Sequence, residues 1–219
     1  MKYILKYKIF ENSNFQKLIN DITEKANKFN VKLILSETNT VKYITGESEV
    51  SGYFVDNGEP TLACAIGGDI ERWGPILAHE SSHMDQWIEN SKEWVENYYK
   101  GREAVDWLDD WCNDKVNLSD SEVDDIIQIA INVELDCEKR TIKKEIEYNL
   151  PVNVEEEIQK SISYILFYRF LKESKKWNTP GKAPYLIKEV WSLMPKTFES
   201  IDFTSVPDKV KKAYYKYCY

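Results

Sequence analysis

The sequence of 219 residues predicts an α+β protein, with a small mixed β-sheet and one helix in residues 1–72 and a mostly helical lobe in residues 73–219. Two observations predict this arrangement. Before residue 72 the apolar residues alternate between the strand period and the helical period, whereas from Trp73 onward they follow the helical period almost throughout. No internal repeat and no long linker interrupts the chain, so we expect both lobes to belong to a single domain.

The sheet lobe is predicted from one apolar stripe and several short apolar runs. Apolar residues recur at helical spacing between Phe15 and Phe29 and predict an amphipathic helix. Strands are predicted at residues 2–10, 31–35, 51–55 and 61–66. The last two strands are joined by Asp56-Asn57-Gly58-Glu59, whose Asn-Gly pair readily takes the left-handed conformations of a tight hairpin turn.

Pro75 marks the first helix of the helical lobe. Proline suits the first turn of a helix because its missing N–H has no intrahelical partner there, so we expect a helix from Trp73 to about Asn90. A connector rich in tryptophan and acidic residues follows. Within it, Asp106-Trp107-Leu108-Asp109-Asp110 lacks the glycine and the alternating ligands of an EF-hand loop, so we expect a solvated loop.

Capping residues place the remaining helices. Ser119 and Glu122 form a Ser-x-x-Glu capping box, which opens a long helix that ends before Pro151. Asn153 can cap a further helix that ends near Trp177. Two shorter helices are predicted near residues 183–194 and 207–217.

Charge and composition exclude several classes of partner. Lys and Arg total 29 and Asp and Glu total 37, and the resulting net charge of −8 makes binding to nucleic acid unfavourable. No stretch approaches the roughly 18 apolar residues of a membrane-spanning helix, and lysines interrupt the apolar amino terminus where a secretion signal would be continuous. We therefore expect a cytoplasmic protein with reduced thiols at its four scattered cysteines, Cys64, Cys112, Cys137 and Cys218.

Both histidines of the chain lie in Leu77-Ala78-His79-Glu80-Ser81-Ser82-His83. Residues four apart share one face of a helix, so His79 and His83 can reach a single Zn²⁺ ion at about 2.0–2.1 Å. Glu80 is rotated about a quarter-turn from His79 and is suited to accept a proton from a water that attacks a carbonyl. The alternative is a pair of histidines that only packs or caps an ordinary helix.

A catalytic zinc ion requires a third protein ligand and an open position. Because no histidine is left, this ligand must be an acid, a cysteine or a tyrosine. Glu134 and Glu138 share one face of the predicted long helix, whereas Asp136 points to roughly the opposite side. We assign Glu134 as the ligand and Glu138 as the acceptor of a ligand histidine N–H. The reverse assignment, a purely solvated acidic face, and Cys137 as the ligand remain alternatives.

His79-Glu80-Ser81-Ser82-His83 followed by Glu134 resembles the zincin metallopeptidases with a glutamate ligand, the gluzincins. In these enzymes an aspartate four residues after the glutamate supports the first histidine, and Glu138 stands at that position here. The residues around Glu134 are also similar to uncharacterised metallopeptidases encoded by tailed phages. The resemblance implies a zincin-like fold, hydrolysis of a peptide or protein substrate, and the host cytoplasm as location.

The same resemblance implies two further features of the site. A zincin strand lies antiparallel to bound substrate, and residues 61–66 occupy that place in chain order, although they also fit an ordinary sheet strand. Related enzymes use a tyrosine or histidine to stabilise the oxyanion, and Tyr164 is our candidate, with Tyr168 as the alternative.

Two other classes of zinc enzyme fit these residues less well, and two other functions remain possible. Metzincins require a third histidine, which the chain lacks. Peptide deformylases take a cysteine ligand from upstream, but Cys64 lacks the Glu-Gly-Cys context and fits a packed strand residue. A catalytically silent zinc-binding module and a zinc amidase that does not cleave peptides remain alternatives. The sequence indicates no oligomeric state.

Overall fold

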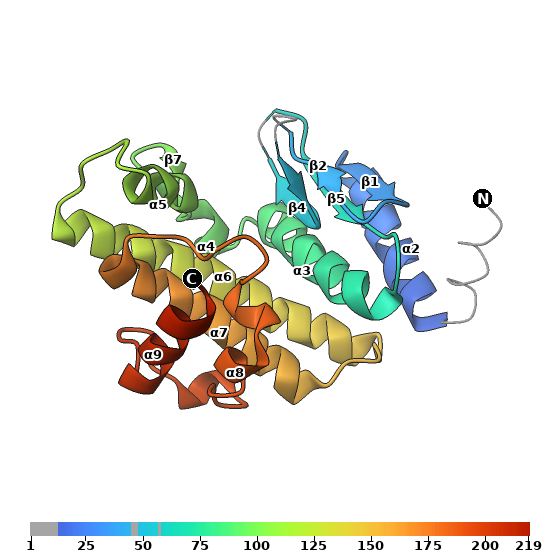
Figure 1. Cartoon of the computed structure of the whole chain (residues 1–219). Coiled ribbons are helices and arrows are strands. Elements are labelled where there is room, and N and C mark those ends of the chain that lie inside the picture. Colours follow the sequence, from blue (N-terminus) through green and yellow to red (C-terminus); the bar gives the residue numbers. More distant parts are fainter. Residues whose placement is uncertain (1–12, 45–47, 57) are drawn as a thin grey trace. The chain divides into compact units, whose positions relative to one another are not determined.

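The computed structural model describes residues 13–44, 48–56 and 58–219 and is mixed α+β, as predicted (Figure 1). The chain divides into two compact units. The first comprises the described residues up to Ser91 together with Lys139–Val152, and the second comprises Lys92–Glu138 and Asn153–Tyr219. The predicted strand at residues 2–10 lies outside the described residues.

The sheet of the first unit has three strands in the order β1 (Lys32–Ser36), β5 (Thr61–Ala65) and β4 (Gly52–Val55). β1 pairs with β5 in parallel, and β4 pairs with β5 in antiparallel register, so the predicted mixed sheet is confirmed. β4 and β5 form the predicted hairpin, although Asn57 of its turn lies outside the described residues. β5 has a strand on each side, so the expectation that residues 61–66 add a substrate strand is wrong.

Different elements pack on the two faces of this sheet. α2 (Ser13–Lys28) contacts β1, and α3 (Ile70–Glu89) contacts β4 and β5 on the same side (Figure 1). The opposite face packs against the short antiparallel pair of β2 (Val41–Lys42) and β3 (Glu49–Val50). The buried residues between the sheet and this pair are Val41, Tyr53, Val55, Ala63 and Ala65.

Helix α3 begins at Ile70, before the predicted start at Trp73, so Pro75 lies inside the helix and not in its first turn. Packing against α2 explains the extra turn. The Trp73 ring lies 5.4 Å from the Phe15 ring between centroids, and a Cβ added at Gly74 would lie only 2.1 Å from Phe15. This close approach buries Trp73 and Gly74, and it outweighs the hydrogen bond that Pro75 cannot donate.

A buried ion-pair network holds the side of α3 that carries Asp85. Asp85 accepts from Lys25 of α2 at 2.6 Å and from Lys144 of α6 (Asp120–Glu147) at 2.8 Å. Lys144 also donates to the Ser81 hydroxyl at 2.8 Å. Burial alone would raise the pKa of Asp85, but the two lysines outweigh it and lower the pKa below its ordinary value.

The capping predictions for the second unit are confirmed. The Ser119 N–H donates to the Glu122 carboxylate at 2.9 Å, and the Glu122 N–H donates to the Ser119 hydroxyl at 3.3 Å, which is the reciprocal pair of a capping box. Asn153 caps α7 (Val154–Ser174) by accepting from the Glu156 N–H. Both long helices therefore begin where their capping residues stand.

The connectors of the second unit contain more regular structure than predicted. α4 (Lys92–Val95) precedes a short antiparallel pair, β6 (Tyr98–Tyr99) and β7 (Arg102–Glu103). Residues 106–110 lie within α5 (Ala104–Cys112) and do not form a solvated loop, because Leu108 is fully buried and orders the segment.

One of the two predicted carboxyl-terminal helices is interrupted, and the other is confirmed. The helix predicted near residues 183–194 is divided into a 3₁₀ turn, η1 (Pro184–Leu186), and α8 (Lys188–Trp191), whereas α9 (Asp208–Tyr217) matches its prediction. Another 3₁₀ turn, η2 (Phe198–Ser200), lies between α8 and α9. An aromatic core that includes Phe167, Phe170 and Tyr214 joins α9 to α7.

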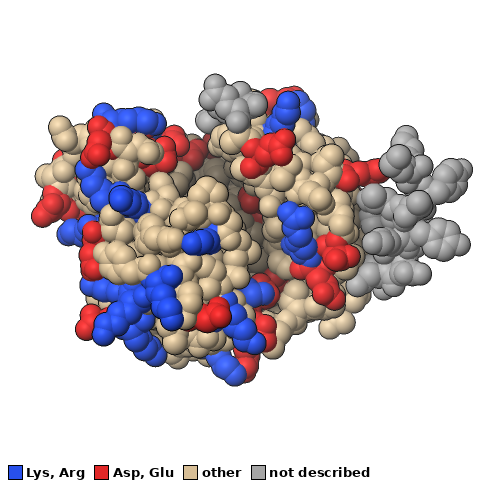
Figure 2. Space-filling model, viewed as in Figure 1, with Lys and Arg blue, Asp and Glu red and all other residues tan. Residues whose placement is uncertain are grey.

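Charged side chains of both signs cover the surface (Figure 2). Exposed lysines are concentrated on α9 at Lys209, Lys212 and Lys216, in the region where Figure 2 shows a group of basic side chains. Among the helices of the described residues, none has the length and apolar character needed to cross a membrane.

We predict that Asp85→Asn destabilises the protein by about 2–4 kcal/mol at pH 7, because it leaves Lys144 buried without its counter-ion. Since the folded-state pKa of Asp85 is below 3.8, its contribution is complete above that pH and is lost as the pH falls through the folded-state value. Urea unfolding at several pH values measures the difference.

The exposed pair Lys32–Glu59 provides the control for this measurement. Its carboxylate is 68% exposed, so Glu59→Gln should change the unfolding free energy by less than about 1 kcal/mol. Equal effects of Asp85→Asn and Glu59→Gln at pH 7 would show that the buried network does not stabilise the fold.

Candidate metal centre

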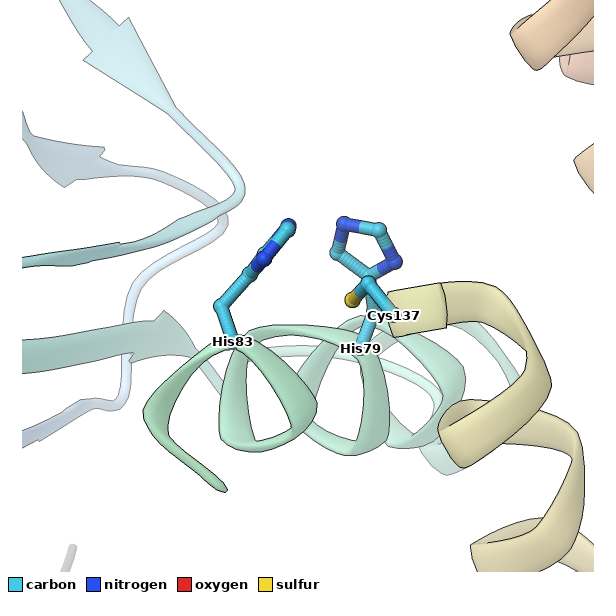
Figure 3. A group of neighbouring side chains, drawn as sticks. All are labelled: His79, His83 and Cys137. Atoms are coloured by element: carbon cyan, nitrogen blue, oxygen red, sulfur yellow. The ribbon is translucent and has the colours of Figure 1, made fainter. Parts of the chain in front are cut away.

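The two histidines extend from the same side of α3 (Figure 3). Their ring centroids are 4.8 Å apart, and the ring planes are nearly perpendicular at 89°. His79 and His83 are both half-buried. One turn of α3 therefore presents two imidazoles side by side, as their spacing of four residues predicts.

Gln86 fixes the orientation of the His83 ring. The Nδ1 atom of His83 lies 2.8 Å from Oε1 of Gln86, which is fully buried on the next turn of α3. Because this oxygen can only accept, Nδ1 carries the hydrogen and Nε2 keeps its lone pair. A histidine nitrogen held in this way is oriented for a metal ion. Gln86 was not among the predicted site residues, although its position three residues after His83 is a usable signal.

The environment of His83 favours the neutral imidazole. Burial above all, together with the charges of His79 and Lys144, lowers the pKa of His83 to about 3, although the hydrogen bond to Gln86 acts in the opposite direction. Metal binding requires a neutral imidazole. At neutral pH the ring is therefore already in the protonation state that a metal ion needs.

Glu80 lies against the backbone of β4. A Cβ added at Gly52 would lie 3.1 Å from Cγ of Glu80 and 2.9 Å from Cγ2 of Ile76. Cys64, opposite Gly52 in the hairpin, is buried in β5, and burial and the nearby Glu80 charge both raise the pKa of its thiol. Cys64 thus packs as a strand residue, and the absence of a side chain at Gly52 leaves room for Glu80.

Glu134 belongs to a chain of hydrogen bonds within the second unit. Oε1 of Glu134 accepts from the Tyr168 hydroxyl at 3.4 Å, and the hydroxyls of Tyr168 and Tyr164 lie 2.8 Å apart. Burial is the largest cause that raises the pKa of both tyrosines well above the ordinary value, and the Glu134 charge adds to it. Both hydroxyls therefore stay protonated at neutral pH. The role of Tyr164 as an oxyanion donor stays a prediction.

Glu138 also has a partner on α7. The Ser161 hydroxyl donates to its Oε2 at 2.7 Å. Glu134, Cys137 and Glu138 stand at positions i, i+3 and i+4 of α6, so they share a helix face. The assignments of Glu134 as metal ligand and of Glu138 as the partner of a ligand histidine stay predictions.

Cys137, on α6 in the second unit, is fully buried, and Figure 3 labels it together with the two histidines. Imidazole nitrogens and thiolate sulfurs are both ligands of zinc. Cys137 therefore stays an alternative to Glu134 as the third ligand.

Comparison with known proteins yields no match, whether against protein families, curated proteins or solved structures. The likeness to gluzincins therefore rests on the sequence motif alone, which comprises His79, Glu80, His83, Glu134 and Glu138.

We predict that Gly52→Ala destabilises the protein by about 1–3 kcal/mol, because the new methyl group would overlap Ile76 and press on Glu80. Ile76→Ala removes the nearest overlapping atom. The double variant should therefore be more stable than the sum of the two single effects implies. Thermal unfolding of the four proteins measures this coupling, and strict additivity would contradict the contact.

Proposed function

We propose that the protein is a zinc-dependent metallopeptidase of the gluzincin type. In this proposal His79, His83 and Glu134 bind Zn²⁺, and Glu80 is the general base. A zinc ion held there would supply a Lewis acid that polarises a carbonyl oxygen and lowers the pKa of water. The substrate is a peptide or a protein.

The observation that carries the proposal is the paired presentation of His79 and His83 on α3. Their rings lie 4.8 Å apart between centroids. Gln86 contacts the Nδ1 atom of His83, so Nε2 is the atom of His83 that would bind zinc. The two imidazoles, together with the Gln86 side chain that orients His83, therefore fit a zinc site.

Glu80 supplies the acid–base chemistry in this proposal. Its carboxylate takes a proton from the attacking water and later transfers it to the leaving amine. Its neighbour Gly52 belongs to β4, which is an edge strand among the described strands of the sheet. An extended peptide that adds to this edge by backbone hydrogen bonds would pass beside Glu80.

A catalytically silent zinc protein is the second candidate, and a metal bond from Cys137 in addition to Glu134 would favour it. Catalytic zinc sites keep one coordination position open, whereas structural sites are closed by four protein ligands. If Glu134 and Cys137 both bound the ion beside the two histidines, the site would be closed. The number of α6 ligands therefore decides between the two functions.

We predict that the purified protein binds close to one equivalent of zinc and that His79→Ala abolishes tight binding. Glu80→Gln should keep the zinc and lower peptide hydrolysis by at least about 100-fold, because it removes the general base but no ligand. Metal analysis and digestion of a peptide library measure the two effects.

Glu89→Gln on the same helix is the matched control, because Glu89 forms an exposed pair with Arg140. It should change neither zinc content nor hydrolysis. Loss of zinc in Glu80→Gln would identify Glu80 as a ligand, and cleavage of small amides without cleavage of peptides would indicate an amidase.

We further predict that Glu134→Gln weakens zinc binding by at least about tenfold, whereas Cys137→Ser changes it by less than threefold. Competition with a chromophoric chelator measures both affinities, with Asp136→Asn as a control on the same helix. A large loss in Cys137→Ser alone would make Cys137 the third ligand, and a large loss in both variants would support the closed site.

A further inference from the structure

Tyr168 makes the hydrogen bond to Glu134 from the middle of a rigid aromatic group. Tyr168 is 2% exposed, and its ring packs edge-on against Trp177 and against Tyr164, with centroid distances of 5.8 Å and 5.3 Å. Tyr164 in turn packs edge-on against Tyr185. These contacts leave the Tyr168 ring little freedom, so its hydroxyl is held at a fixed position beside Glu134.

Each hydroxyl has one proton, and this fixes which group donates and which accepts in the hydrogen bonds between Tyr164, Tyr168 and Glu134. The Tyr168 hydroxyl donates its one proton to Oε1 of Glu134 at 3.4 Å. In the contact of 2.8 Å with Tyr164, Tyr168 must then be the acceptor and Tyr164 the donor. The proton of Tyr164 therefore points at Tyr168, and the two hydroxyls act in series on one carboxylate oxygen.

We propose that Tyr168 is a positioning residue that orients the Glu134 carboxylate for zinc, with Tyr164 as the donor that orients Tyr168. This inference rests on the proposed function, in which Glu134 is the third ligand. Carboxylate ligands of metal ions are themselves held by hydrogen bonds, and loss of such a partner typically weakens metal binding by 10–100-fold. The proposal gives Tyr164 a task other than oxyanion stabilisation.

The chain offers a closely matched control. Tyr214 is also fully buried in the second unit, and its hydroxyl donates to the Ser163 backbone carbonyl of α7 at 2.7 Å. Tyr214→Phe thus removes a buried tyrosine hydroxyl bonded to the same helix without touching Glu134. General effects of losing a buried hydroxyl on stability are common to both variants.

The test compares Tyr168→Phe, Tyr164→Phe, Tyr214→Phe and Glu134→Gln with the unaltered full-length protein. Zinc affinity is measured by chelator competition, and the visible absorption spectrum of the Co²⁺-substituted protein reports ligand geometry. We expect Tyr168→Phe to weaken zinc binding by 10–100-fold and to alter the Co²⁺ spectrum. Tyr164→Phe should have a smaller effect in the same direction, and Tyr214→Phe should leave both readouts unchanged.

The outcomes separate this inference from the proposed function. If Glu134→Gln weakens zinc binding but Tyr168→Phe matches Tyr214→Phe, the positioning role is wrong and the zinc site stands. If Glu134→Gln leaves zinc affinity unchanged, Glu134 is not a ligand and both proposals about it fail. If Tyr168→Phe does not fold, the Co²⁺ spectrum of Tyr164→Phe decides, and an unaltered spectrum would overturn the inference.

Discussion

The structure depends on helix α3 carrying buried and half-buried polar groups on two opposite faces. Residues four apart share a face, so His79 and His83 lie on one side while Ser81 and Asp85 lie on the other. Both sets are partly or fully buried and each requires partners. Asp85 finds them in Lys25 and Lys144, and this ion-pair network ties α2 and the end of α6 to the back of the histidine helix.

Local signals allowed much of the fold to be predicted. The reciprocal bonds between Ser119 and Glu122 and the cap at Asn153 involve residues three apart, so the sequence contains the whole interaction. The start of α3 and the ordering of α5 depend instead on packing with distant residues. Phe15 contacts Trp73 across 58 positions, and no local rule contains that contact.

The candidate site divides in the same way. The face shared by His79 and His83 follows from helical geometry, and Gln86 was predictable in principle from its spacing. The bond from Tyr168 to Glu134 spans 34 positions between two helices, and only the fold reveals it. The need for glycine at position 52 likewise follows from the contact between β4 and Glu80 of α3, which no local sequence rule predicts. Helix-borne ligands were thus easier to predict than the groups that orient them.

X-ray absorption spectroscopy at the zinc edge, on protein reconstituted with one equivalent of zinc, tests the central claim most directly. The account predicts the scattering pattern of two imidazoles, with nitrogen and oxygen ligands at about 2.0–2.1 Å. It also predicts no sulfur ligand. A sulfur shell at about 2.3 Å would contradict Glu134 as the third ligand in favour of Cys137, and the absence of imidazole scattering would contradict the proposed site altogether.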